Sequence, residues 1–458
     1  MNSEFANPSL YGETNLDLIY AYFGLAFLMS AFIVYKAKTT YWVELFILSF
    51  YLMTGNLNEE LTFALPGISF FEIQPDRLLF LYFSFFLTRQ LFQPQASNTG
   101  TREWKVPWFI LMIFLYAAWI IISQISHLVD LGVEEVILST IHCLTVIVLI
   151  YAMRRLADRQ SLAVLGKAFI IGAVVTALVS IIQLVYDPMF LRIGDQRIAF
   201  GTVLRSNGLF NNEYCNAYFM ITALAWTLIS VRQQRMRFLL IAIFTLGVIS
   251  SFQRMSWLIL SLVLVIYVLK IEQIALEKLV LLSLCGLIGL VSIFIIFNRE
   301  IMNSGLVKER LSEVPDSRLG YYRMVIDNIG KKPLFGYGGK NNELYYYSML
   351  RITHERKRAT GEEGDIHSGY FSSLFYYGVP GLIFFIAFVG LALLYFGQLY
   401  KQHIFFAVPF LLGLLYAIGN LTNTLLFSQY LSIIYAIHLG LGWGVRNMRT
   451  ESLASLGN

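Results

Sequence analysis

The chain has 458 residues, of which 57% are hydrophobic and 14% charged, and its mean hydropathy is +0.63. Soluble domains carry about 25% charged residues, so this composition excludes a soluble enzyme and predicts an all-α polytopic membrane protein. The three cysteines lie in or beside apolar runs and are expected to be buried free thiols, so neither a disulfide framework nor a zinc site is supported.

Apolar runs long enough to span a bilayer, about 17 to 25 residues, recur along most of the chain. About ten helices are expected in residues 1–297, with no removable signal peptide at the start, and the last ones in residues 379–458, ahead of a short cytoplasmic tail. In all we expect about twelve to fourteen spans, near 16–35, 41–56, 77–92, 107–126, 133–152, 165–186, 214–231, 237–252, 255–270, 279–297, 379–397, 404–419 and 426–445.

Lysine and arginine fall in alternate loops, which sets the orientation by the positive-inside rule. Lys36 and Lys38 form the first such cluster, and the C-terminal tail with Arg446 and Arg449 forms the last. The rule places residues 298–378, a long polar loop, on the outer side of the membrane.

Four arginines break this rule, because they lie in loops assigned to the outer side. Charges at a membrane boundary are commonly functional or paired, although arginine also reaches lipid headgroups with its long side chain. Contact with lipid headgroups is the favoured interpretation for Arg192 and Arg197. A functional role is the favoured interpretation for Arg205 and Arg254.

The long outer loop carries the remaining polar motifs. The run Gly336-Tyr-Gly338-Gly339 is not a phosphate loop, because no Lys-Ser or Lys-Thr follows it, and a tight turn is expected there. His367 precedes an aromatic run that stops at Gly378, with Pro380 beyond, which predicts a helix start at the histidine and a helix end at the glycine. The charged stretch 351–365 is typical of a solvated segment, and a lid is the alternative.

These motifs in this order resemble the O-antigen ligase and O-antigen polymerase superfamily of bacterial membrane glycosyltransferases. The resemblance covers about residues 205–381 and departs from the family pattern at three places. The family usually has His-Asn where this chain has His367-Ser368, and Asn-Pro-Asn where it has Asn211-Asn212-Glu213. A serine often precedes the family arginine directly, whereas Gln253 precedes Arg254 here. The segments that carry the resemblance are Arg205-Ser-Asn-Gly-Leu-Phe-Asn211-Asn212-Glu213, Ser251-Phe-Gln253-Arg254, Arg318-Leu-Gly-Tyr-Tyr-Arg323, Pro333 to Gly338, His367-Ser368, and Tyr376-Tyr-Gly-Val-Pro-Gly381.

The resemblance implies a GT-C-like helical fold and an inverting, metal-independent transferase without a cofactor. Its donor would be a glycan on undecaprenyl diphosphate, and its acceptor a sugar chain or a lipid A core. Arginine suits a diphosphate because it binds oxyanions through two parallel N–H bonds, and histidine suits a general base near neutral pH. The candidate catalytic residues are His367, Arg254 and Arg318; the diphosphate ligands are Arg205, Arg254 and Arg318; and the further candidates are Arg192, Arg197, Arg323 and Tyr337.

Polymerase and ligase remain open, with the polymerase favoured, because no motif particular to the ligase branch stands out. A polysaccharide or lipid flippase is the alternative of another class, although such transporters typically show internal repeats and mid-span charges. The lipid bilayer is the expected environment and a chain-length regulator a further partner, whereas no nucleic acid and no metal are expected. The sequence has neither an Asp-x-Asp pair nor a His-Glu-x-x-His motif.

Overall fold

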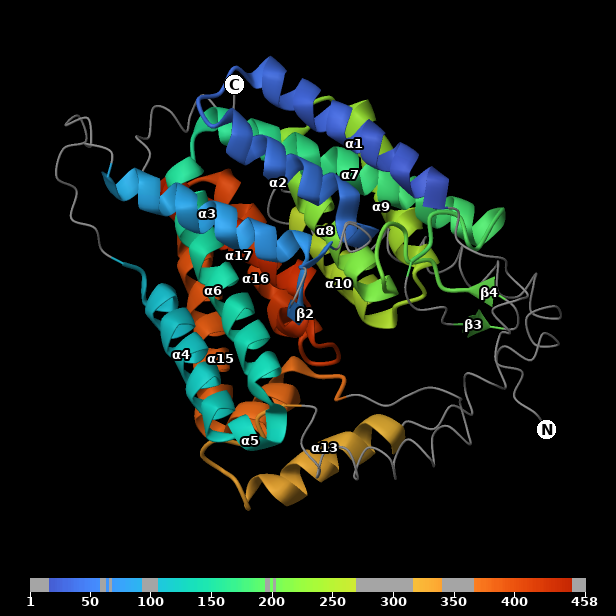
Figure 1. Cartoon of the computed structure of the whole chain (residues 1–458). Helices are drawn as coiled ribbons and strands as arrows, with labels where there is room; N and C mark the ends of the chain where they lie inside the picture. The colour runs from blue at the N-terminus through green and yellow to red at the C-terminus, as the bar shows by residue number, and fades with distance from the viewer. Residues whose placement is uncertain are drawn as a thin grey trace. The chain divides into compact units, whose positions relative to one another are not determined.

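The computed structural model describes residues 16–57, 63–65, 68–92, 106–193, 198–200, 203–268, 316–339 and 366–446. The protein is an all-α polytopic membrane protein (Figure 1). Its helices are α1 (Leu16–Ala37), α2 (Trp42–Thr54), α3 (Pro75–Phe92), α4 (Trp108–Ser126), α5 (Leu128–Leu131), α6 (Val133–Leu156), α7 (Arg159–Val185), α8 (Glu213–Ser230), α9 (Gln234–Ser250), α10 (Arg254–Ile266), α13 (Asp316–Ile329), α15 (Gly369–Tyr400), α16 (Ala407–Gly419) and α17 (Gln429–Arg446), with 3-10 turns η4 (Ile404–Phe406) and η5 (Leu425–Phe427).

Five of these helices are long and apolar enough to cross a membrane by length and composition, within the described ranges. They are α1, α4, α6, α7 and α15, and shorter apolar helices accompany them. Twelve of the thirteen apolar runs in the sequence coincide with helices, and the thirteenth, 279–297, lies outside the described residues. The total number of spans therefore stays a prediction.

Two short antiparallel hairpins interrupt the helical fold, and the sequence patterns do not predict them. β1 (Phe63–Leu65) pairs with β2 (Ile68–Ile73), and β3 (Ile198–Phe200) pairs with β4 (Val203–Leu204). Both hairpins fall in connections between helices that the charge pattern assigns to the outer side. The second one leads directly into the loop that carries Arg205.

The chain forms two compact units. The described parts of residues 174–319 make up the first, and residues 16–173 with 320–458 make up the second. In the first unit, α8 is buried along nearly its whole length and packs against α9 and α10. In the second, α4 packs on α15 and α6 packs on α17, and Figure 1 shows these four helices side by side.

Small residues let α17 approach α6 closely. A Cβ atom on Gly440 would lie 2.6 Å from Cβ of Met153, and one on Gly444 would lie 2.6 Å from the carbonyl oxygen of Arg154. Close backbone approach through small residues is how membrane helices gain van der Waals contact, since lipid and side chains are equally apolar. The second unit is thus built on a tightly packed pair of helices.

Candidate active site

Helix α15 breaks at Gly378, where the sequence predicts a helix end. Gly378 has φ 72° and ψ −170°, a conformation that essentially only glycine adopts. The helix resumes directly after this residue and continues to Tyr400. Pro380 has no N–H, which leaves the carbonyl of Tyr376 without its usual helical donor. The break therefore creates backbone acceptors inside a buried region, and these acceptors need partners.

The loop at residues 333–339 supplies those partners. Its glycines, Gly336 and Gly338, have φ +63° and +80°, so the tight turn expected from the sequence is present. This turn lies against the break in α15 and pairs with it through three backbone hydrogen bonds: Tyr337 N to Phe375 O, Gly338 N to Tyr376 O, and Val379 N to Pro333 O, each 2.8 Å.

The fit between the loop and the broken helix leaves no room for side chains. A Cβ atom on Gly336 would lie 2.6 Å from the backbone nitrogen of Gly378, and a Cβ on Gly378 would lie 2.6 Å from the carbonyl oxygen of Pro333. Helix α4 completes the contact, because Trp119 donates from Nε1 to the Tyr377 carbonyl (2.8 Å) and stacks on the ring of Phe335. The glycines are needed here for backbone approach and not for phosphate binding.

Tyr337, a further candidate for substrate contact, lies inside this interlock. Its side chain is buried, its ring stacks on Phe375 at a centroid distance of 4.7 Å, and its hydroxyl donates to the Asn328 carbonyl (3.0 Å). Burial raises the pKa of the Tyr337 hydroxyl above its usual value, so the group stays neutral. The geometry gives Tyr337 a packing role that joins α13 to α15.

His367 lies two residues before the first helical residue of α15, at the helix start that the sequence predicts. Ser368 caps the helix by accepting from Phe371 N, and its own hydroxyl donates to the Asn420 carbonyl (3.1 Å). The carbonyl of His367 accepts from the Tyr322 hydroxyl (3.2 Å). The backbone on both sides of the half-buried histidine is therefore held in place.

The helix α13 carries the next two candidates. Arg323 is exposed on this helix, next to Tyr322, whose ring stacks on Phe371 at 4.3 Å. Arg318 belongs to the first turns of α13, and its side chain lies outside the described part of the structure. Arg197 also lies outside it.

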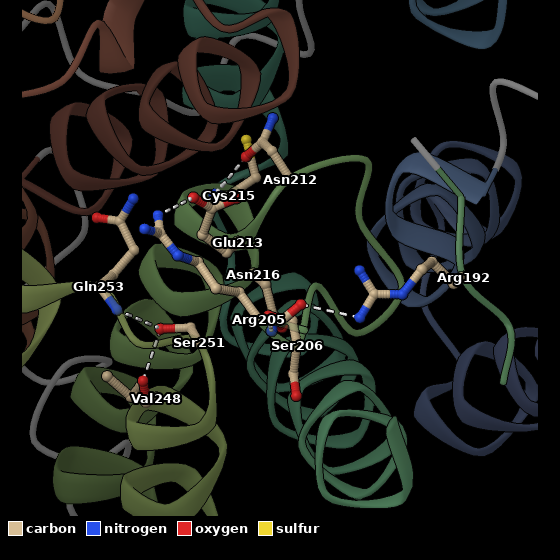
Figure 2. Close-up of polar contacts among 10 residues, drawn as sticks. All are labelled: Arg192, Arg205, Ser206, Asn212, Glu213, Cys215, Asn216, Val248, Ser251 and Gln253. Atoms are coloured by element: carbon tan, nitrogen blue, oxygen red, sulfur yellow. Dashed lines mark hydrogen bonds and ion pairs between the residues drawn. The ribbon is translucent and has the colours of Figure 1, made fainter. Parts of the chain in front are cut away.

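Arg205 belongs to the first unit and is held by an ion pair. Its Nη1 lies 3.0 Å from Oε1 of Glu213, in the first turn of α8, where the helix dipole favours a carboxylate (Figure 2). The Arg205 side chain keeps 18% of its surface exposed, whereas that of Glu213 keeps 3%. Within the described part of the chain, Nε of Arg205 is buried without a hydrogen-bond partner. Nη1 of the guanidinium is thus paired with a carboxylate, whereas its Nε–H has no acceptor in the described structure.

Arg192 is placed differently from the lipid-facing position that the sequence favours. It is 1% exposed, Nε donates to the Pro188 carbonyl (2.5 Å), and Nη2 donates to the Arg205 carbonyl (2.8 Å; Figure 2). Burial lowers the pKa of Arg192 to about 10, against the carboxylates of Glu213 and Asp187, which raise it. The headgroup interpretation is wrong for Arg192, because backbone carbonyls take up the guanidinium inside the protein.

The turn that precedes Arg254 lies beside the Arg205 loop. Ser206 N donates to the carbonyl of Ser250 (3.1 Å), and Phe252 adopts a positive φ of 52°. Ser251 Oγ donates to the Val248 carbonyl (2.6 Å) and accepts a long hydrogen bond from Gln253 N (3.4 Å; Figure 2). Arg254 is the first residue of α10 and is exposed.

The candidates therefore fall into two groups. The structure brings Arg192, Arg205 and the turn before Arg254 together in the first unit, and it brings His367, Tyr337 and α13 together in the second. Among the described residues, no three His, Cys, Asp or Glu side chains are placed to hold a metal ion.

Residues 216–386 match the family model described as O-antigen ligase. The match includes Arg254, Arg318, the glycine loop and His367, and it begins shortly after Arg205. No curated protein matches the chain. The chain therefore contains, over residues 216–386, a region similar to the O-antigen ligase family, which supports a membrane enzyme of O-antigen ligase type.

Proposed function

We propose that this enzyme transfers a glycan from undecaprenyl diphosphate to a sugar acceptor at the outer face of the bacterial cytoplasmic membrane. The observation that carries the proposal is the state of Arg205. A partly exposed guanidinium is anchored at one nitrogen by Glu213, while its Nε has no partner in the described structure. The exposed part of this guanidinium is open to an oxyanion, and charge-assisted hydrogen bonds from arginine to phosphate oxygens are about twice as strong as neutral ones.

In the proposed reaction, the acceptor hydroxyl oxygen forms a bond to the anomeric carbon of the donor sugar. The bond between that carbon and the diphosphate oxygen breaks with inversion, and undecaprenyl diphosphate leaves with the electron pair. His367 takes the hydroxyl proton, as a general base. Arg205, Arg254 and Arg318 bind the diphosphate and stabilise the charge that develops on it, which is electrostatic catalysis by preset donors.

This step needs no nucleotide sugar and no metal, because the arginines neutralise the leaving group. The backbone on either side of His367 is fixed by Tyr322 and by the cap at Ser368. Such anchoring favours a base that keeps one orientation toward its substrate. Arg192 and Tyr337 take no direct part in the proposal, since both are buried in packing contacts.

We further propose that the acceptor is another lipid-linked glycan, so that the enzyme polymerises O-antigen or exopolysaccharide repeat units, with a chain-length regulator as its partner. A ligase reaction onto a lipid A core is the second candidate, and the description of the matching family favours it. Both reactions use the same donor and the same leaving group.

The donor alone separates these functions. The purified enzyme is given a defined undecaprenyl-diphosphate oligosaccharide in EDTA, without nucleotide sugar. A ladder of longer lipid-linked chains supports the polymerase, whereas product that forms only after addition of a lipid A core supports the ligase. A flippase forms no glycosidic bond in either case and moves the donor across a sealed vesicle. Strict dependence on a divalent metal or on a nucleotide sugar would overturn the proposal.

A further inference from the structure

Buried polar side chains of α7 and α8 hold the loop that carries Arg205. We propose that Thr176 and Asn216 are positioning residues, which fix the backbone from Arg205 to Gly208 and thereby set how Arg205 meets a diphosphate. The inference rests on the proposed function, because it assigns these two residues to the same donor-binding loop.

Asn216 is wholly buried in α8 and has a partner for each polar atom of its amide. Its Oδ1 accepts from Thr176 Oγ1 (3.1 Å), and its Nδ2 donates to Ser180 Oγ (2.9 Å) and to the Ser206 carbonyl (3.4 Å). Thr176 Oγ1 in turn accepts from the backbone N–H of Leu209 (3.0 Å). The pair thus contacts the loop on both sides of Gly208.

Gln183, on the same face of α7, adds a second clamp. Its Oε1 accepts from the backbone nitrogens of Asn207 (3.1 Å) and Gly208 (2.9 Å). Its Nε2 donates to the carbonyls of Phe190 (2.9 Å) and Gly208 (3.1 Å). An amide has two donor hydrogens and two acceptor lone pairs, so Gln183 is fully satisfied and ties two loop segments to one helix.

Gly208 shows how closely the loop fits this network. It has φ +57°, and a Cβ atom there would lie 2.6 Å from Oδ1 of Asn216 and would also collide with Oγ1 of Thr176. Only glycine combines that conformation with that approach. The loop backbone at Gly208 therefore packs against α7 and α8 without room for a side chain.

The network reaches Arg205 through its neighbour in the chain. Ser206 is bonded to Asn216 through its carbonyl and to Ser250 through its N–H, and the carbonyl of Arg205 accepts from Arg192. Removing the Thr176 hydroxyl leaves Leu209 N and Asn216 Oδ1 without this partner in a buried site. Misplacement of an active-site group by about 1 Å costs up to about a hundredfold in reaction rate, and the same loss of geometry weakens the contact of Arg205 with an oriented ligand.

The test compares two isosteric changes in the first unit. Thr176→Val removes a hydroxyl with two partners, whereas Thr227→Val in α8 removes a buried hydroxyl that has no hydrogen-bond partner in the described structure. Thr176→Ser keeps the hydroxyl. The full-length protein is titrated with undecaprenyl diphosphate, the product released by the proposed reaction, and the Kd of the folded fraction is measured together with the melting midpoint.

We expect Thr176→Val to raise the Kd about tenfold, Thr176→Ser to restore it, and Thr227→Val to leave it unchanged. A purely structural role would lower the melting midpoint of Thr176→Val without changing the Kd of its folded fraction, and that result overturns the inference. If Thr176→Val is not recovered as folded protein, Ser206→Ala replaces it in the test. This variant loses the hydrogen bond from Ser206 Oγ to the Ser180 carbonyl and should raise the Kd about threefold. An unchanged Kd for Ser206→Ala overturns the inference.

Arg205→Lys distinguishes this inference from the proposed function. If Arg205→Lys leaves the Kd for undecaprenyl diphosphate unchanged, the donor-binding proposal fails and the positioning role fails with it. If Arg205→Lys raises the Kd while Thr176→Val behaves like Thr227→Val, the positioning role alone is refuted. Equal Kd values for Thr176→Val/Arg205→Lys and Arg205→Lys alone would show that Thr176 acts through Arg205.

Discussion

Replacing Gly378 by alanine should separate the halves of α15 from the loop that holds them. Alanine has to leave a backbone region that only glycine occupies readily, which costs about 1–3 kcal/mol. Its Cβ would also displace the carbonyls of Pro333 and Leu334 and so remove the hydrogen bond from Val379 N to Pro333 O. Loss of this hydrogen bond adds about 0.5–1.5 kcal/mol, so the total loss is at least about 1.5 kcal/mol.

Gly390→Ala in the same helix is the matched control. A Cβ atom on Gly390 would have no other atom within 4 Å, and glycine is a poorer helix residue than alanine by about 0.5–1 kcal/mol. We therefore expect Gly390→Ala to keep or slightly raise the melting midpoint measured by fluorescence-detected size exclusion in detergent. Gly378→Ala should melt several degrees lower. Equal midpoints for the two variants, within about 1 °C, would refute the interlock as a source of stability.

Four further predictions follow from the proposed roles. Lysine substitution of Arg205, Arg254 or Arg318 should lower the transfer rate about tenfold or more, roughly 1.4 kcal/mol, at unchanged protein abundance, because lysine cannot bind bidentately; near-normal rates in all three would leave them as headgroup anchors. His367→Ala should abolish transfer but keep donor binding, with His354→Ala tolerated as its control; a largely retained rate at saturating substrate would move the base to Asp365 or Glu363. A single cysteine at Ser348 should react with an impermeant maleimide in intact cells, and reaction only after the inner membrane is broken would reverse the orientation. Arg192→Lys should lower the melting midpoint, because an ammonium cannot bridge the carbonyls of Pro188 and Arg205; an unchanged midpoint would contradict the anchoring role.

Local patterns predicted the helices and the break in α15 well. Apolar runs of spanning length are read directly from the chain, and Gly378 with Pro380 acts on its own neighbours, so both signals are local. The turn at Gly336 was equally predictable. Its partner was not, because Phe375 lies about forty residues away and only tertiary packing brings the two together.

The burial and the partners of the arginines could not be predicted from the sequence. Arg192 and Arg205 share one loop, yet one is buried by the carbonyl groups around it and the other is partly exposed beside Glu213. A usable signal for the buried network did exist in α7. Thr176, Ser180 and Gln183 are spaced i, i+4 and i+7, which places three polar side chains on one face of an otherwise apolar helix.

The anchoring of both ends of residues 340–365 has a consequence for how this protein can change. On one side Gly338 N is bonded to the Tyr376 carbonyl, and on the other Gly369 N is bonded to the carbonyls of Asn420 and Asn423, all within one unit. Because both anchors lie outside that range, we expect the start of α15 beside His367 to keep its position when residues are inserted between Gly339 and Ile366.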